Sequence, residues 1–273
     1  MSKMAPPSKK QKVQRPWQEI AKDAQDHRDA SLAQVKPGPE SSSMYPAPEH
    51  ALEQSHPSAA CKISMKFPET TLHPRDVQIT ETLPEDLVQS LATGELSATD
   101  VTTAFLRRAV IAQKLVSAIF QVDFDEMPIF EQTNCVTELL PQRALERAKF
   151  LDDYYLEHKK PIGPLHGLPI SVKEMIGMKD LGLNAGYVAW WGKTAMEDAH
   201  VLQILWNAGA VFHARTTQPQ SMMHLETDSN LYGLTVNPYN RDMSAGGSSG
   251  GEGALIGMRA SCLGVGSDIG GNS

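Results

Sequence analysis

Residues 246–273 read Gly-Gly-Ser-Ser-Gly-Gly-Glu-Gly-Ala-Leu-Ile-Gly-Met-Arg-Ala-Ser-Cys-Leu-Gly-Val-Gly-Ser-Asp-Ile-Gly-Gly-Asn-Ser, and this stretch decides how the rest of the chain is interpreted. Two clusters of glycine and small hydroxyl residues flank an apolar run, Ala254 to Met258, whose composition predicts a buried helix. Glycines this dense indicate backbone that turns sharply or approaches a ligand closely. A Ser on such a loop, with free N–H groups beside it, is suited to acyl transfer.

Two other interpretations of this stretch fit its residues less well. One is an anion-binding loop at a helix N-terminus, but the Gly-Lys-Ser/Thr ending of a P-loop and the spacing of a dinucleotide site are both missing. The other is a nucleophile elbow, because residues 247–251 match Gly-x-Ser-x-Gly. That motif also needs an acid and then a His later in the chain, and no His follows Gly251.

Three motifs resemble those of the amidase signature family and occur in the family's order. They are Gly-Leu-Pro-Ile-Ser-Val-Lys-Glu at 167–174, Gly-Gly-Ser-Ser-Gly-Gly at 246–251 and Gly-Ser-Asp-Ile-Gly-Gly at 266–271. Residues 216–222 and 232–238 also resemble the branch that contains fungal acetamidases and fatty acid amide hydrolases. The chain is therefore identified as similar to the N-terminal part of a member of this branch.

The resemblance runs from about Pro84 to Gly271 and implies an α/β fold, the amidase-signature mixed sheet flanked by helices. Since the chain stops at Ser273, we expect this fold to be C-terminally truncated. The sequence itself shows a β–α–β order, with an apolar strand at 168–173 and another at 210–212. Strands that alternate with helices favour a parallel or mixed sheet, and Lys173 falls where a strand gives way to a loop, a common place for functional groups.

The resemblance assigns catalytic roles without a His. Lys173 corresponds to the family's terminal base, and Ser248 to the bridging serine, which relays a proton from a cis peptide. The N–H groups of residues 269–272 would form the oxyanion hole, and Met222 would line the acyl pocket. The substrate-binding and oxyanion-hole residues implied are therefore Met222, Ser248, Ile269, Gly270, Gly271 and Asn272. No cofactor and no metal is implied.

The nucleophile position departs from the family pattern. The family places its nucleophilic Ser four residues after the motif Asp, here Asp268, but residue 272 is Asn and a Ser follows only at 273. A neutral amide cannot form an acyl-enzyme. We therefore expect an amidase by family, which hydrolyses linear carboxylic acid amides to carboxylate plus ammonia or amine. The alternative is a catalytically dead homologue, and we expect this chain as written to be inactive.

The proposed base also sets a requirement on its surroundings. A free Lys has a pKa of about 10.4, which must fall by roughly 2–3 for the amine to act as a base near neutral pH. Burial among apolar neighbours such as Ile170 and Val172 would lower it in this way. His166 and His224, the His residues nearest the motifs, are interpreted as structural or pocket-wall residues.

The chain divides into three parts by composition. Residues 1–35 form a basic tail and an N-terminal helix from about Trp17 to Leu32; the basic cluster at 9–12 is a disordered tail or a nuclear signal. Residues 36–75 are rich in Pro and Ser and are predicted to be a disordered linker. Residues 76–273 form the partial amidase-signature domain.

Helical patterns recur in that domain. We predict helices at 84–94, from Ser97 through Val116, at 141–158 and from Asp198 to Gly209. Ser97 and Asp100 have the spacing of a capping box, and Asp198 is expected to cap the fourth helix. Residues 117–133 match nothing in the family, so an insertion and a gene-model error both remain open.

Composition limits the partners. The net charge of −7 argues against nucleic acid as the main partner. The sequence has three cysteines, Cys61, Cys135 and Cys262, which form neither a disulfide framework nor a zinc pattern and favour a reducing compartment. No apolar run is long enough to span a bilayer. We expect a cytoplasmic protein that binds a small-molecule amide, and the resemblance allows a homodimer in the full-length family.

Overall fold

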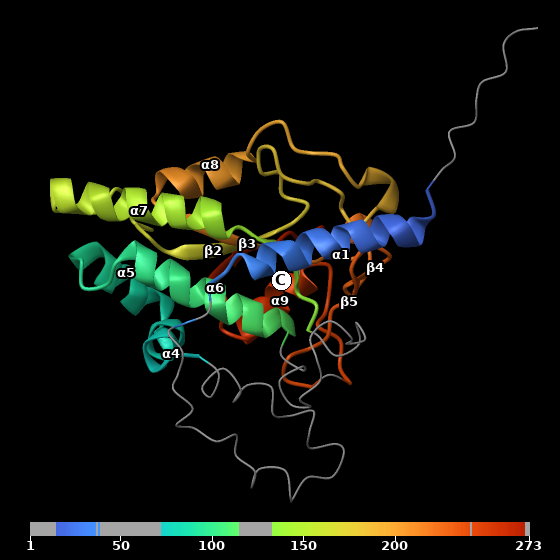
Figure 1. The fold of residues 1–273 in the computed structure, drawn as a ribbon, viewed down its shortest axis with the longest axis horizontal. Helices are drawn as coiled ribbons and strands as arrows, with labels where there is room; N and C mark the ends of the chain where they lie inside the picture. Colours follow the sequence, from blue (N-terminus) through green and yellow to red (C-terminus); the bar gives the residue numbers. More distant parts are fainter. Residues whose placement is uncertain (1–14, 37, 39–71, 115–132, 241, 271–273) are drawn as a thin grey trace, which may run out of the picture.

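The computed structural model describes residues 15–36, 38, 72–114, 133–240 and 242–270. Its centre is a four-stranded sheet with the strand order β1-β3-β2-β6, of which β2 and β3 are labelled in Figure 1. The strands are β1 (Val136–Leu139), β2 (Pro169–Lys173), β3 (Val211–Thr216) and β6 (Leu263–Val265). β2 pairs in parallel with β3 and β6, whereas β1 pairs antiparallel with β3, so the sheet is mixed, as predicted.

The two middle strands are buried on both faces. Every residue of β2 and of β3 is buried, which is the usual condition of parallel strands whose crossover helices cover the sheet. The crossover from β2 to β3 contains α8 (His200–Asn207). On its face of the sheet, Leu202 of α8 packs in one cluster with Ile170, Val172 and Phe212.

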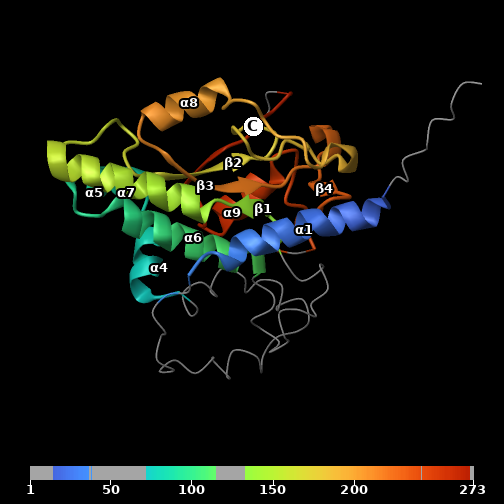
Figure 2. The same ribbon diagram turned by 45° about the horizontal axis from the view of Figure 1, so that its top comes forward.

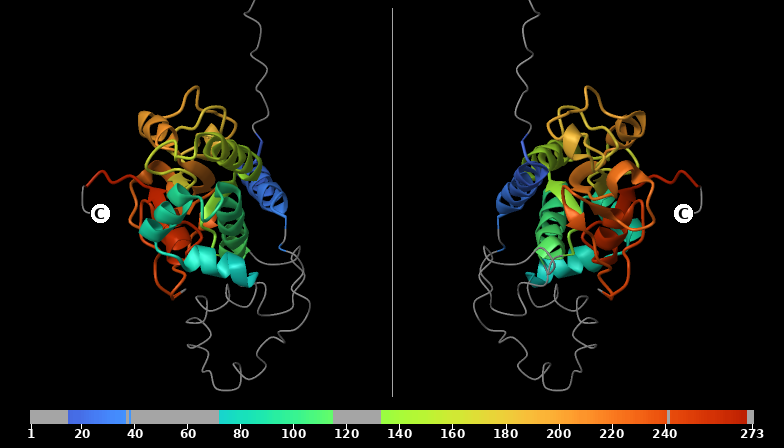
Figure 3. Two further views of the ribbon diagram at one scale, coloured as in Figure 1. Left: turned by 90° about the vertical axis from the view of Figure 1, so that its left-hand side faces the viewer. Right: turned by 90° about the vertical axis from the view of Figure 1, so that its right-hand side faces the viewer.

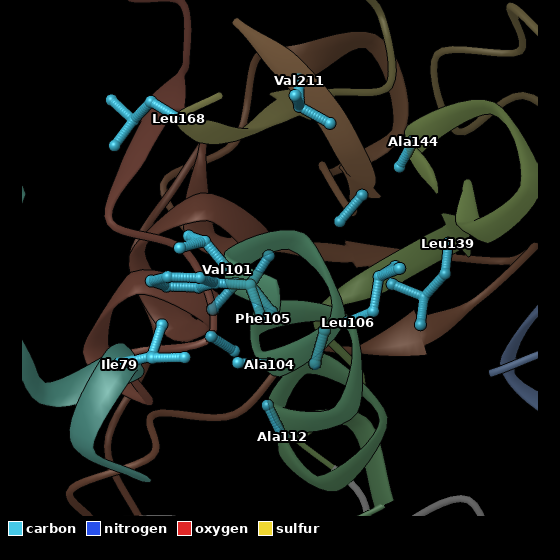
Figure 4. Close-up of a cluster of buried hydrophobic side chains, with 14 of the residues drawn as sticks. Ile79, Val101, Ala104, Phe105, Leu106, Ala112, Leu139, Ala144, Leu168 and Val211 are labelled. Atoms are coloured by element: carbon cyan, nitrogen blue, oxygen red, sulfur yellow. The ribbon is translucent and has the colours of Figure 1, made fainter. Parts of the chain in front are cut away.

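The larger core lies on the opposite face. Around Phe105 of α6 (Ala98–Lys114) it gathers side chains from β1, β3 and the neighbouring helices, including Leu139 and Val211 (Figure 4). The helices that contribute to it include α4 (Pro74–Glu81), α5 (Pro84–Thr93), α7 (Pro141–His158) and α9 (Gly250–Gly257). The sheet is therefore covered by helices on both faces.

The N-terminal helix lies along the edge of the sheet. α1 (Trp17–Ala33) runs beside β1 and reaches the small β4–β5 hairpin (Figure 2). β4 is Asp228–Ser229 and β5 is Gly233–Leu234, and two short 3-10 helices, η4 (Val188–Trp190) and η5 (Gln220–Met222), lie in the connecting loops. The last described residues, in red, project from the side opposite α1 (Figure 3).

Most predicted helix boundaries agree with the structure. α7 has the predicted bounds, and α5 ends at Gly94, whose φ of 74° is the left-handed C-cap conformation that glycine adopts without steric cost. α4 was not predicted. The N–H of Asp100 donates to Ser97 Oγ at 3.0 Å, but the Asp100 carboxylate pairs with Arg75, so only half of the predicted capping box forms.

One predicted cap is wrong. The N-cap of α8 is Ala199, and Asp198 instead accepts a hydrogen bond from the N–H of Lys179 at 2.7 Å. The side chain therefore ties the preceding loop together rather than satisfying the helix N-terminus. The predicted linker between 39 and 71, the basic tail at 1–14, Val116 and nearly all of 117–133 lie outside the described residues.

Candidate active site

Lys173 is the last residue of β2 and is fully buried. Its Nζ donates to Ser248 Oγ at 2.7 Å, to Ser267 Oγ at 2.9 Å and to Ser249 Oγ at 3.1 Å. The contact that a proton relay between Lys173 and Ser248 would require is therefore present. These distances lie in the normal range for N–H···O bonds, so the amine is surrounded by three hydroxyls.

Glycines bring the Ser248 loop close to the sheet. A Cβ added at Gly251 would lie 2.4 Å from the backbone N of Thr217, just beyond β3, and one added at Gly250 would lie 2.3 Å from Thr227 Oγ1. Only glycine leaves room for this approach. The Gly247–Ser248 peptide is cis, the geometry that the resemblance implied. Ser249, which accepts from Lys173 Nζ, then precedes α9.

Ser249 and Ser267 join the two motifs to each other. Ser267 N–H donates to Ser249 Oγ at 3.2 Å, and Ser249 Oγ donates to the Ser267 carbonyl at 3.1 Å. Neither serine was predicted as a site residue, although both lie inside the motifs on which the resemblance rests. Sequence spacing gives no direct sign that these two hydroxyls converge on one amine.

Burial changes the chemistry of Lys173. Loss of solvent lowers the pKa of its amine from the ordinary 10.5 to about 8, while the charges of Glu252 and Asp268 partly oppose that change. The predicted fall is present, but Ile170 and Val172 do not surround the amine: they are buried on the opposite face of the sheet, in the cluster with Leu202. An amine with this pKa is partly neutral near pH 8 and can accept a proton there.

The structure shows no hydrogen bond between Lys173 and the other predicted site residues that it describes. Met222 lies in η5 with a φ of 59°, and the 85% exposed Ile269 follows Asp268. The Gly270 N–H donates to Asp268 Oδ1 at 2.8 Å, so in this structure it already has an acceptor. Gly271 and Asn272 lie outside the described residues. The roles of these four positions and of Met222 therefore stay predictions.

The two histidines near the motifs have local contacts. His166 is buried and its Nδ1 accepts the N–H of Ile162, whereas the exposed His224 accepts the N–H of Glu226. Within the described residues, no group of three or more His, Cys, Asp or Glu could hold a metal ion. None of the helices in the described part of the chain combines the length and apolar character that a membrane span requires.

Comparison with known proteins agrees with this fold. The family described as Amidase matches residues 128–272. The acetamidase of Emericella nidulans is 40% identical over 258 residues, which cover 94% of this chain and 41% of the relative. The acetamidase of Aspergillus oryzae is 43% identical over 201 residues, which cover 74% of this chain and 34% of that relative.

Solved structures give the same result. A fatty acid amide hydrolase superimposes with a TM-score of 0.73 at 33% identity, over 93% of this chain and 40% of that one. The native peptide amidase from Stenotrophomonas maltophilia superimposes with a TM-score of 0.52 at 30% identity, over 64% of this chain and 34% of that one. The mixed sheet with flanking helices is thus the amidase-signature fold. The chain belongs to the amidase family, and it spans about two fifths of the length of the first of these relatives.

Proposed function

We propose that the whole protein hydrolyses linear carboxylic acid amides to a carboxylate plus ammonia or an amine, by a Ser-Ser-Lys mechanism. The observation that carries this proposal is the 2.7 Å contact between Nζ of the buried Lys173 and Ser248 Oγ. The similar proteins named acetamidase and fatty acid amide hydrolase support linear amides as the substrate class. The proposal includes a cytoplasmic location and a small-molecule substrate, with no nucleic-acid partner.

Lys173 is the base of the proposed mechanism. Its neutral amine takes the proton of Ser248 Oγ, and Ser248 in turn takes the proton of the nucleophilic hydroxyl as that hydroxyl attacks the amide carbonyl. The same two groups return the proton to the departing amine, which leaves an acyl-enzyme. Water then attacks this ester, its proton passes through Ser248 to Lys173 and back to the nucleophilic hydroxyl, and the carboxylic acid is released. The N–H groups of residues 269–272 hold the negative oxygen that forms on the carbonyl. Because a base works only when deprotonated, the rate rises as pH increases through about 8, the pKa of Lys173.

A second candidate function rests on one residue. Position 272, where the family pattern places the nucleophile, is Asn272. Its amide has no hydroxyl to attack the substrate, and Ser273 is one residue further along the backbone. In extended backbone, a shift of one residue turns the side chain to the opposite face. On this ground we propose that the chain with Asn272 is a catalytically dead homologue that keeps the Lys173–Ser248 pair.

A chimera separates the two candidates. The C-terminal part of the Emericella nidulans acetamidase is appended after residue 272, with either Asn272 or Asn272→Ser, and ammonia release from acetamide and a fatty amide is measured. Turnover with Asn272 would support the amidase, whereas turnover only with Asn272→Ser, which we expect for this sequence, would support the inactive homologue. In that chimera Lys173→Ala should lower kcat roughly 10²–10⁴-fold, the usual contribution of a general base, while the exposed Lys179→Ala should not.

Two results would contradict these proposals. Turnover by the 273-residue chain itself, lost in Lys173→Ala, would show that Asn272 does not abolish catalysis. An active chimera whose rate is the same with Lys173→Ala would remove Lys173 from the mechanism.

A further inference from the structure

A buried carboxyl group accepts hydrogen bonds from residues of β2 and β3 next to Lys173 and has no role in the mechanism above. Glu252 is in the first turn of α9 and is only 5% exposed. Its Oε2 accepts from Ser171 Oγ at 2.5 Å, and its Oε1 accepts from Thr216 Oγ1 at 2.8 Å. Ser171 lies two residues before Lys173 on β2, so both side chains are on the same face of the sheet.

Three neighbouring strands are adapted to this one carboxyl. Thr216 of β3 is the register partner of Lys173, and Gly264 of β6 is the register partner of Ser171. A Cβ added at Gly264 would lie 2.0 Å from Glu252 Oε2, so the glycine leaves the space that the carboxyl occupies. The strands thus supply two hydroxyl donors and one gap within two residues of each other along the sheet.

The apolar surroundings of Glu252 raise the free energy of its ionised form. Ala254 and Leu255 of the same helix belong to the apolar core, and a buried carboxylate without a hydrogen-bonded cation is costly. Burial raises the pKa of Glu252 to about 7, although the bonds from Ser171 and Thr216 and the charge of Lys173 lower it. Near neutral pH the carboxyl is therefore close to the point where it gains or loses a proton.

Four other titratable or charged groups lie near Glu252, and each of them either stays neutral near pH 7 or has its own contact away from the carboxyl or acts on Lys173. The buried thiol of Cys135, next to β1, has its pKa raised to about 11 by burial and stays neutral. His213 of β3 contacts Ala260 O beyond α9, and burial lowers its pKa to about 4. Arg108 of α6 donates to Met258 O at the far end of α9. Asp268, after β6, acts with Glu252 on the amine of Lys173.

We propose that Glu252 is a positioning residue for the candidate base, and that its carboxyl and the amine of Lys173 titrate as one coupled pair. The ionised carboxyl favours the ammonium that forms when Lys173 takes the proton of Ser248. The neutral carboxyl favours the free amine. The inference rests on the proposed function in taking Lys173 as the base, but its test does not depend on turnover.

The test is an NMR pH titration of the full 273-residue chain labelled with ¹³C at lysine Cε and glutamate Cδ. Lys173→Met and Glu252→Gln assign the two signals. Glu252→Gln keeps the size of the side chain and, because hydroxyls both donate and accept, both contacts. We expect the Lys173 signal to titrate in two steps in the unchanged protein. In Glu252→Gln it should titrate in one step, with its pKa lower by about 1.

The matched control is Glu138→Gln. Glu138 is a buried carboxylate of β1 that pairs with Arg215 at 2.8 Å, and its charge does not contribute to the pKa of Lys173. Its substitution should leave the Lys173 titration unchanged. An unchanged Lys173 curve in Glu252→Gln would overturn the proposal, and so would an equal change in Glu138→Gln.

A second variant covers the case in which Glu252→Gln does not fold. Ser171→Ala keeps the carboxyl and removes one donor that favours its ionised form. The pKa of Glu252 should then rise further in this variant. If the Glu252 signal instead titrates near the ordinary glutamate value of about 4.3, in this variant or in the unchanged protein, the pair does not exist as proposed.

Discussion

His213, in the middle of β3, is a buried residue whose neutral form the fold requires. It has no exposed surface, its Nε2 lies 3.0 Å from Ala260 O, and burial lowers its pKa from 6.5 to about 4. Between pH 6.5 and about 4, His213 is therefore protonated in the unfolded chain but neutral in the folded protein. The stability from this residue is complete above pH 6.5 and is lost as pH falls from 6.5 towards 4, a difference of about 3 kcal/mol.

His213→Gln should reduce that acid sensitivity. Gln keeps an N–H for Ala260 O and does not titrate, so its free energy of unfolding should fall less than that of the unchanged protein between pH 7 and 4, by about 3 kcal/mol. Glu252 changes stability in the opposite sense over part of this range, but it is present in both proteins and cancels. Urea unfolding at each pH measures the difference, with the exposed His158→Gln as control. Equal acid sensitivity in both proteins would refute the assignment.

At the residue scale the sequence predicted the Lys173–Ser248 contact because both residues lie in motifs that the family resemblance identifies. It did not predict that Ser249 and Ser267 contact the amine. It also did not predict that Glu252 is buried against Ser171 and Thr216, next to Lys173. Their convergence depends on how α9 and β6 pack against β2, which is a tertiary arrangement. A buried carboxyl also contradicts the local expectation that charged residues face solvent.

At the element scale, α6 begins with a cap supplied by a different helix. The Asp152 carboxylate of α7 accepts the N–H groups of Ala98 at 2.6 Å and Thr99 at 3.0 Å, and the Thr99 hydroxyl at 2.6 Å. The first N–H groups of a helix have no partner within it. Asp152 therefore satisfies the start of α6 and fixes α7 against it.

Asp152→Ala should lower the free energy of unfolding by about 1–3 kcal/mol, the usual cost of removing a charged acceptor from such donors. Asp153→Ala is the matched control, since the next carboxylate on α7 is exposed. Urea unfolding of the two variants at neutral pH makes the comparison. Equal stability of Asp152→Ala and Asp153→Ala would mean that solvent replaces the cap without loss.

The same two helices show what periodicity can and cannot predict. The apolar stripe of α7 gave its bounds, since Ala144, Ala148 and Leu151 recur at helical spacing and are buried. The cap at Asp198 was predicted from spacing alone and is wrong because a loop N–H, that of Lys179, lies within reach of its side chain. Local patterns predict the elements, but competing tertiary donors decide the contacts of polar side chains.

At the scale of the whole molecule, the two edges of the sheet are protected differently. β1 is covered by side chains from helices: Ser31 Oγ of α1 accepts the N–H of Leu139 at 2.9 Å, and Gln113 Oε1 of α6 accepts the N–H of Val136 at 3.0 Å. On the other side, β6 pairs only with β2 among the described residues. Unpaired strand edges are templates for association with another chain.

The β6 edge should therefore cause the 273-residue chain to self-associate. Exposed apolar side chains surround it, with Ile256 38% exposed, Leu263 40% exposed and Ile269 85% exposed. Sedimentation velocity over a series of protein concentrations should show a rising average mass. Leu263→Lys should reduce this association, because a charged residue on an edge strand opposes pairing. Leu156→Lys, at an exposed position on α7 away from this edge, should have no effect. A single monomeric species at all concentrations would contradict the prediction, and an equal effect of the two lysine variants would place the association elsewhere than β6.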